Sequence, residues 1–202
     1  MHMPTYLTDI FSRSPLEIAL LVFLTSISAL LIWARFNVFQ TENSASSKGS
    51  LFYDPVVCVH LLMTYTCFFA SDYSKLIPIE VPLILYLCAI SLFISSIRTT
   101  TDLKFALSTT PEKIITRGAF RFVRHPFYTS YILTWTASCL AYSSIILWTT
   151  LIYLIGFYVY SAQQEEGAIL RGPNNESYAL YQQQVGMFLP RISSWLKLLS
   201  VH

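Results

Sequence analysis

Long runs of apolar residues alternate along this chain with short polar stretches. A helix that crosses the roughly 30 Å hydrocarbon core of a bilayer needs about 20 consecutive, mostly apolar residues. The first three runs have this length, the last two come close to it, and the stretches between runs are loop-sized, so the pattern predicts membrane-spanning helices. We expect five of them, over residues 16–36, 56–70 (extended backwards by 51–53), 77–97, 126–142 and 145–160.

The last two of these runs are short, and only Ser143-Ser144 separates them. Read as one helix, they would overshoot the bilayer. We therefore predict a tight hairpin. Such a hairpin brings the two polar segments that flank it, residues 98–128 and 161–191, to the same face of the membrane.

Composition supports this interpretation. The chain has 202 residues, of which 54% are hydrophobic and 12% are charged, whereas soluble domains carry about 25% charged residues. These values exclude a disordered chain. The four cysteines lie in apolar runs, where they are expected to be small hydrophobic residues without disulfides. The predicted fold class is all-α, an integral-membrane helical bundle of about five transmembrane helices.

The basic residues predict the orientation, because lysine and arginine favour the cytoplasmic side. With the loop from Arg98 to Arg124 in the cytoplasm, eleven of the 13 basic residues fall on that side and only Arg13 and Lys75 fall on the other. The amino terminus is then lumenal or outside, and the carboxyl terminus is cytoplasmic. A cleaved signal peptide is the alternative interpretation of the first run, but the run is longer than the usual signal sequence.

The segment before the fourth run contains the sequence Arg124-His125-Pro126. Proline is tolerated in a first helical turn and disfavours helical geometry in the residue before it. His125 is thus expected at the mouth of the helix, where free backbone N–H groups favour an anion. Alternatively, Arg117, Arg121 and Arg124 are ordinary anchors on lipid phosphates.

Two adjacent carboxylates, Glu165 and Glu166, are expected just beyond the end of the fifth span. Acidic residues oppose the helix dipole there, so helix stability gives little reason for them. Successive helical positions diverge by about 100°, so only one of the two can readily point inward. The alternative is a solvated helix end.

His60 lies in the middle of the second span. An ionisable residue inside a membrane is a functional candidate by default. We nevertheless expect a neutral histidine that is hydrogen-bonded to a neighbouring helix.

Several of these residues together resemble a known family. The pattern R-H-P-x-Y at residues 124–128, the hairpin, the pair Glu165-Glu166, and Y-x-x-Y at Tyr178 and Tyr181 resemble the isoprenylcysteine carboxyl methyltransferases. These belong with the phospholipid methyltransferases to a wider group of integral-membrane enzymes that use S-adenosylmethionine. Residues 112–120 are also similar to the family's stretch before R-H-P. The resemblance covers residues 110–190.

The resemblance implies a cytoplasm-facing cofactor pocket for S-adenosylmethionine within a catalytic region at 101–202, which follows the transmembrane region at 1–100. Glu165 would hold the cofactor's ammonium, so we expect its loss to abolish cofactor binding and the loss of Glu166 to be milder. The implied catalytic residues are His125, Tyr128 and Glu165. The implied cofactor-binding residues are Glu112, Lys113, Ile114, Ile115, Phe120, His125, Pro126, Phe127, Tyr128 and Glu165.

The implied activity is O-methylation of the carboxylate of a carboxyl-terminal isoprenylcysteine at the endoplasmic reticulum, with the lipidated substrate entering from the bilayer. In the family an arginine stands four residues before the first glutamate, whereas this chain has Ser161 at that position. Arg171 is a candidate replacement cation, and with Ser161 it is a candidate substrate-binding residue. Ser130 replaces a common glycine.

Because the departures fall on substrate residues, methylation of a phospholipid amine or of a hydrophobic isoprenoid-type metabolite is the alternative activity. A sterol-reductase-like enzyme and a non-catalytic membrane protein are further alternatives. The chain has no glycine-rich phosphate loop, and neither a metal nor a nucleic acid is expected as a partner.

Overall fold

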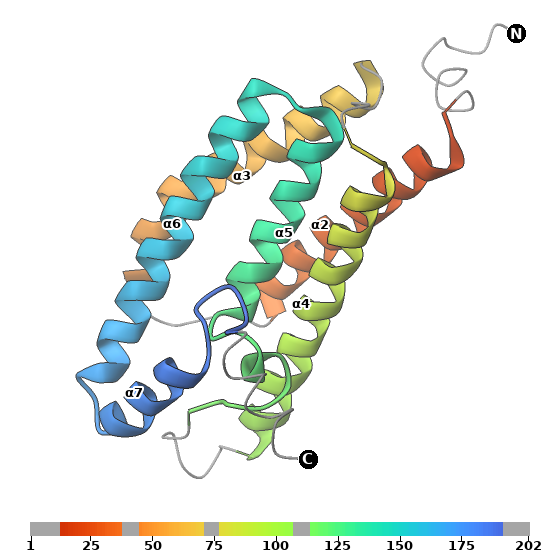
Figure 1. The fold of residues 1–202 in the computed structure, drawn as a ribbon. Helices are drawn as coiled ribbons and strands as arrows, with labels where there is room; N and C mark the ends of the chain where they lie inside the picture. The colour runs from red at the N-terminus through yellow and green to blue at the C-terminus, as the bar shows by residue number, and fades with distance from the viewer. Residues whose placement is uncertain (1–12, 38–44, 71–76, 107–113, 192–202) are drawn as a thin grey trace, which may run out of the picture. The chain divides into compact units, whose positions relative to one another are not determined.

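The computed structural model describes residues 13–37, 45–70, 77–106 and 114–191. Within these ranges the chain forms six α-helices and one short 3-10 turn, and it contains no β-strand beyond one isolated bridge. The all-α prediction is confirmed for this part of the chain. The elements are α2 (Pro15–Asn37), α3 (Ala45–Ala70), α4 (Glu80–Ala106), η1 (Gly118–Arg121), α5 (Pro126–Tyr142), α6 (Ile145–Leu170) and α7 (Asn175–Gln184) (Figure 1).

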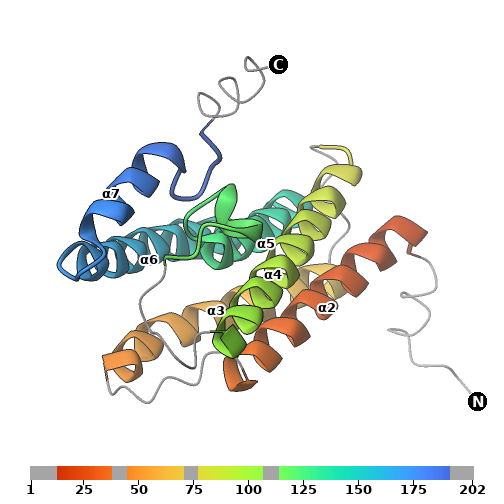
Figure 2. The same cartoon turned by 90° about the horizontal axis from the view of Figure 1, so that it is seen from below.

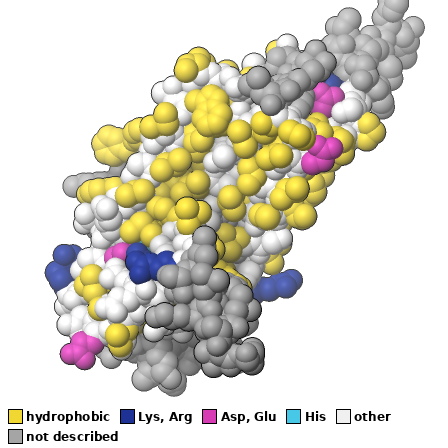
Figure 3. All heavy atoms as spheres, in the orientation of Figure 1, with side chains coloured by type: hydrophobic (Ala, Val, Ile, Leu, Met, Phe, Trp, Pro, Cys, Tyr) yellow, Lys and Arg dark blue, Asp and Glu magenta, His cyan; other side chains and the backbone are white. Residues whose placement is uncertain are grey.

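Four helices, α2, α3, α4 and α6, are long and apolar enough to cross a membrane. Large apolar side chains on them face outward, as at Leu62 (67% exposed) and Ile152 (71% exposed). Figure 3 shows apolar side chains over most of the visible surface of the helices. In a lipid bilayer these side chains contact acyl chains, which makes such exposure favourable. The remaining predicted span, residues 126–142, forms α5, a helix of 17 residues that is shorter than the other four. The count of five spans therefore stays a prediction.

The predicted hairpin between α5 and α6 is confirmed. α5 ends at Tyr142 and α6 begins at Ile145, so only Ser143 and Ser144 connect them (Figure 1). Ser143 has a φ of 49°, in the left-handed region of backbone conformation. This conformation reverses the direction of the chain, and a small polar residue tolerates its free-energy cost.

Three predicted boundaries are wrong. The second span was expected to begin at residue 51, but α3 already begins at Ala45. The third span was expected to end at Ile97, but α4 continues to Ala106. The fifth span was expected to end near Tyr160, but α6 continues to Leu170. Alanine, glutamine and glutamate favour helices, so the polar composition after Tyr160 marks the end of the apolar run without ending the helix.

The helices contribute to two compact units. The first unit contains α2, α3, α4 up to Ala89, and the hairpin from Ile132 to Phe157. The second contains α4 from Ile90, η1, α5 up to Tyr131, and the chain from Tyr158 through α7. The predicted functional division at residue 100 stays a prediction.

In the first unit, buried polar side chains join neighbouring helices. His60 on α3 is hydrogen-bonded through Nδ1 to Thr150 Oγ1 on α6, at 2.7 Å. Tyr86 on α4 and Ser138 on α5 share a hydrogen bond of 2.8 Å between their hydroxyls. Such bonds satisfy polar groups that would be costly in an apolar interior. The prediction that His60 is bonded to a neighbouring helix is confirmed.

Candidate functional site

The second unit contains the motif at residues 124–128, which the chain enters through the turn η1. Gly118 has a φ of +61°, and a Cβ built on it would lie 2.1 Å from Thr99 Oγ1 on α4. Both the left-handed backbone and this close approach require glycine. Gly118 thus starts η1 directly against α4.

Helix α7 holds the other side of this turn. The Tyr181 hydroxyl donates to the Phe120 carbonyl at 2.5 Å. Burial raises the pKa of Tyr181 to about 12, so the phenol keeps its proton at neutral pH and serves as a donor.

The turn leads into residues 124–126, called here the Arg-His-Pro corner. The Arg124 and His125 backbone N–H groups donate to the carbonyls of Gly186 and Met187, at 2.9 and 3.1 Å. Figure 2 shows the chain after α7 lying beside the segment around η1. α5 begins at Pro126, as predicted, so the missing N–H of proline costs no helical hydrogen bond.

Glu166, on α6, is buried and surrounded by donors from this corner and from α7. Its Oε1 accepts from Arg124 Nε at 2.8 Å and from His125 Nε2 at 2.9 Å. Its Oε2 accepts from Gln182 Nε2 at 2.7 Å and from Arg124 Nη2 at 3.3 Å. We call Arg124, His125, Glu166 and Gln182 the Glu166 cluster. All the donors converge on one carboxylate, so the cluster ties α6, the corner and α7 together.

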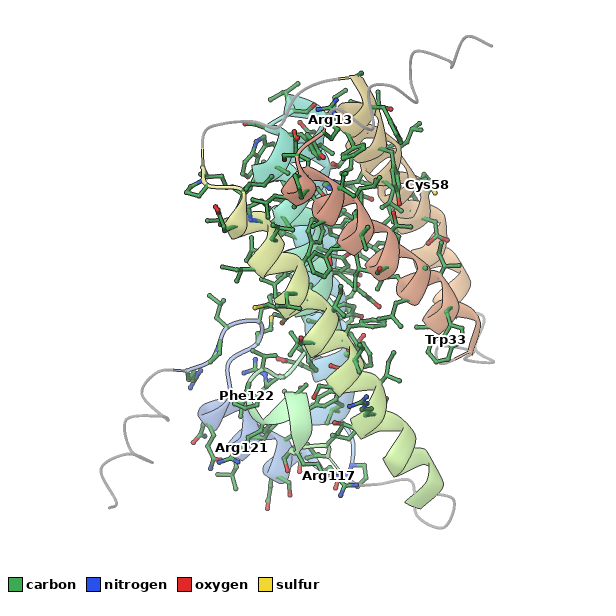
Figure 4. The ribbon with its side chains drawn as sticks, turned by 90° about the vertical axis from the view of Figure 1, so that its right-hand side faces the viewer. Arg13, Trp33, Cys58, Arg117, Arg121 and Phe122 are labelled. Atoms are coloured by element: carbon green, nitrogen blue, oxygen red, sulfur yellow. The ribbon has the colours of Figure 1, made fainter. Side chains whose placement is uncertain are left out.

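Arg124 is therefore not an anchor on lipid phosphates. Besides Glu166, it contacts the carbonyls of Gln182 at 3.3 Å and Val185 at 2.5 Å through Nη1. The alternative role as a surface anchor is wrong for this arginine. Arg117 and Arg121 are exposed and lie with Phe122 along the turn η1 (Figure 4), so an anchoring role remains open to them.

Glu165 points elsewhere, as expected for adjacent helical positions. Its side chain is 53% exposed, and its Oε2 lies 3.4 Å from His125 Nδ1. Its Oε1 accepts a short hydrogen bond from the Tyr128 hydroxyl. Only one of the two glutamates is buried, as predicted. The buried one is Glu166, and the one that the resemblance assigns to the cofactor remains accessible.

Aromatic rings line up beside the Glu165 carboxylate. The His125 and Tyr128 rings stack at 5.7 Å between centroids, and Tyr128 stacks on Tyr158 at 5.4 Å. Tyr131 lies 5.6 Å from Tyr158. Aromatic faces attract cations. A half-exposed carboxylate beside such faces is suited to a positively charged ligand.

The predicted adenosine-side residues are only partly connected to this site. Phe120 contacts Phe127 edge-to-face at 6.4 Å, and Phe127 lies one residue after Pro126. Ile114 and Ile115 are half-buried just before η1. Glu112 and Lys113 lie outside the described residues.

The two candidate substrate residues lie near the end of α6. Ser161 is half-buried on α6, four residues before Glu165, while Arg171 is exposed just after the helix ends at Leu170. Within the part of the chain that the structure describes, no hydrogen bond, ion pair or ring contact joins either of them to the Arg-His-Pro corner. Their role in substrate binding stays a prediction.

Sequence reasoning missed Gln182, Tyr131 and Tyr158. For Gln182 a signal existed, because it follows Tyr178 by four residues and therefore shares a helical face with it. Tyr158 stands seven residues before Glu165 on α6, which also places the two on one face. Neither residue belongs to the motif.

The cluster does not resemble a metal site. Although an imidazole and two carboxylates lie together, no group of three histidine, cysteine, aspartate or glutamate side chains within the described ranges is arranged to hold a metal ion. Glu166 already accepts from three side chains. Comparisons with models of protein families, with curated proteins and with solved structures find no match to this chain.

Proposed function

We propose that this chain is an integral-membrane methyltransferase that uses S-adenosylmethionine. The observation that carries the proposal is the half-exposed Glu165 carboxylate, held by Tyr128 and His125 beside a stack of aromatic rings. The motif resemblance of residues 124–128 and 165–166 supports the same activity. So do the four apolar helices, which suit an enzyme acting on lipid-like substrates.

The donor set fits the chemistry of S-adenosylmethionine. This molecule carries an ammonium, a carboxylate and a sulfonium, and when bound it supplies an electrophilic methyl group on the positively charged sulfur. Glu165 would pair with the ammonium. The faces of Tyr128 and His125 would lie along the sulfonium, since each cation–π contact contributes roughly 0.5–2 kcal/mol. Phe120 and Phe127 would supply apolar faces for the adenosine side.

The remaining polar residues prepare this site. Tyr128 donates to Glu165 and so orients the carboxylate. The Glu166 cluster holds His125 at the start of α5 through bonds that need no ligand. Methyl transfer depends chiefly on in-line positioning and on exclusion of water. A preformed arrangement of this kind serves both requirements.

The acceptor implied by the resemblance is the carboxylate of an isoprenylcysteine, which would reach the site from the bilayer. Location in the endoplasmic reticulum with a cytoplasmic carboxyl terminus belongs to the same proposal. A phospholipid amine is the second candidate acceptor.

Binding of radiolabelled S-adenosylmethionine to the purified full chain tests the proposal. The wild type should bind it, and Glu165→Ala should remove measurable binding because the ammonium loses its anion. Glu176→Ala, which removes an exposed carboxylate at the start of α7, is the matched control and should bind like the wild type. Equal affinity of the wild type and Glu165→Ala would refute the assignment.

A further inference from the structure

The outer face of the turn η1 carries two arginines and one aromatic ring. Arg117, Arg121 and Phe122 are all exposed, and Phe122 keeps 41% of its surface accessible (Figure 4). Ala119 and Val123 are buried instead, at 2% and 3% exposure. Two apolar side chains thus hold the turn against the protein, while positive charge and an apolar ring face outward.

The segment after α7 brings further exposed groups beside this turn. The bridge between Val123 and Gly186 places that segment next to the residue that follows Phe122. A Cβ built on Gly186 would lie 3.6 Å from Arg191 Cγ, so the exposed Arg191 side chain packs over this glycine. Leu189, in the same segment, is 79% exposed. We call this set of exposed residues the basic edge: Arg117, Arg121, Phe122, Leu189 and Arg191.

The protein does not neutralise the arginines of the basic edge. Among the described residues, neither Arg117 nor Arg121 has an ion-pair partner. Arg191 Nη1 donates to the Gln183 carbonyl at 2.6 Å, which orients the guanidinium without compensating its charge. Arg124 differs from these three, because it is buried and paired with Glu166. The basic edge therefore attracts anions from outside the protein.

The turn η1 is packed against the end of a candidate membrane span. The apolar part of α4 that is suited to cross a bilayer runs from Glu80 to Thr100. Gly118, at the start of η1, approaches Thr99 on that helix so closely that a Cβ would lie 2.1 Å from Thr99 Oγ1. Groups in contact with the last turn of a span lie at the level of the phospholipid headgroups. The anions available at that level are phosphates.

We propose that the basic edge binds the headgroups of anionic phospholipids. A guanidinium offers a planar fork of N–H donors that matches two oxygens of a phosphate. The exposed side chains of Phe122 and Leu189 enter the boundary between headgroups and acyl chains, where their apolar surface leaves water. A zwitterionic lipid carries the same phosphate together with a cation, so the uncompensated arginines favour a headgroup of net negative charge.

This proposal requires the chain to lie in a bilayer, but it does not depend on the proposed methyltransferase activity. The basic edge shares no side chain with the Glu166 cluster or with Glu165. A lipid bound there would hold η1 at the membrane surface, and η1 leads directly into the Arg-His-Pro corner.

A tryptophan placed in the basic edge reports which lipid it contacts. The full chain with Phe122→Trp is reconstituted in phosphatidylcholine vesicles that contain increasing fractions of brominated phosphatidylglycerol or, in a second series, brominated phosphatidylcholine. Bromine quenches nearby indoles, and the emission of the wild type with its four native tryptophans is subtracted. Half-maximal quenching should need about fivefold less of the anionic lipid, the factor that one arginine contributes at an anionic surface.

The matched control is Ile152→Trp, at an apolar position of α6 that is 71% exposed. Its added tryptophan should be quenched equally by the two brominated lipids, because no described arginine accompanies it. Both positions are exposed, so neither substitution disturbs the packed interior. The lipids are present in both leaflets, so the comparison is independent of the orientation of the chain.

Removal of the charges tests their role. With Phe122→Trp as the reporter, the pair Arg117→Gln and Arg121→Gln should reduce the preference for the anionic lipid to less than about twofold. Roughly 1 M NaCl should have the same effect, because it screens charges beyond about 3 Å. Arg171→Gln, which removes an exposed arginine after α6, should leave the preference unchanged.

Three outcomes would overturn the proposal. Equal quenching of the tryptophan at position 122 by the two lipids would remove the preference for negative charge. Quenching by neither lipid would place the basic edge in water, where a protein partner could cover it. Loss of the preference in Arg171→Gln as well would assign it to the overall charge of the chain. None of these outcomes affects the binding of S-adenosylmethionine, which tests the proposed function separately.

Discussion

The two buried histidines of this protein lie in contrasting surroundings. His60 in the first unit is fully buried and His125 in the second is 8% exposed. His60 has one hydrogen-bond partner, Thr150, and the Trp135 ring 5.0 Å away, while its Nε2 has no partner. Both nitrogens of His125 lie beside carboxylates.

The partners of the two rings differ in charge accordingly. The Thr150 hydroxyl, which also lies 2.9 Å from the carbonyls of Ile146 and Leu147, is a neutral partner for His60 Nδ1. No charged group among the described residues pairs with His60. Burial is shared by both histidines, so burial alone does not mark a functional one. What distinguishes His125 is a carboxylate beside each ring nitrogen.

Of the substitutions that test the contrast between the two histidines, Glu166→Ala should have the largest effect. The change leaves the Arg124 guanidinium buried without its anion and removes the acceptor for His125 and Gln182. Removing one partner of a buried ion pair costs about 3–5 kcal/mol. We expect a loss of this size in the free energy of unfolding, measured by denaturant titration in detergent micelles, together with loss of cofactor binding.

This expectation reverses the milder role that the sequence suggested for Glu166. The physical reason is that the sequence could not say which glutamate is buried. Glu176→Ala should change the free energy of unfolding by less than about 0.5 kcal/mol, as is usual for surface positions. A similarly small change in Glu166→Ala would show that the Glu166 cluster does not form.

A smaller effect is expected from Gln182→Leu. Leucine favours helices as glutamine does, but it lacks the N–H group that donates to Glu166 Oε2. Hydrogen bonds to charged groups contribute about 1.5–3 kcal/mol, so the unfolding free energy should fall by that amount. The neighbouring Gln183→Leu alters an exposed side chain and is the matched control. Equal stability of the two variants would exclude Gln182 from the cluster.

The smallest effect should follow from His60→Leu. The substitution removes one hydrogen bond and also an acceptor nitrogen that has no partner. Thr150 keeps its bonds to the backbone, so no new unpaired group is left. We expect a change of at most about 1 kcal/mol in the unfolding free energy. A loss of several kcal/mol would instead assign His60 a role beyond packing.

Much of the fold could be predicted because its causes are local. Apolar runs of bilayer length predict helices wherever they occur, and α2, α5 and the start of α6 agree with the predicted boundaries to within a residue or two. Predictions failed where hydropathy and helix propensity diverge. The polar residues 45–50 and the end of α6 are helical although they interrupt or follow the apolar runs.

The candidate site was predictable only in part. The motif singled out His125, Tyr128 and Glu165, and the structure brings these three side chains together. It did not identify Gln182, which contributes to the Glu166 cluster from a different helix.

The sequence by itself determined that this chain forms apolar helices, that Pro126 starts one of them, and that only one of two adjacent glutamates can be buried. Those outcomes follow from chain length, backbone geometry and hydrophobicity. Tertiary structure alone decided that Glu166 is the buried one, since its partner Arg124 lies 42 positions away in the chain. A pairing over that distance depends on how the corner, α6 and α7 pack, and no local pattern of residues encodes it.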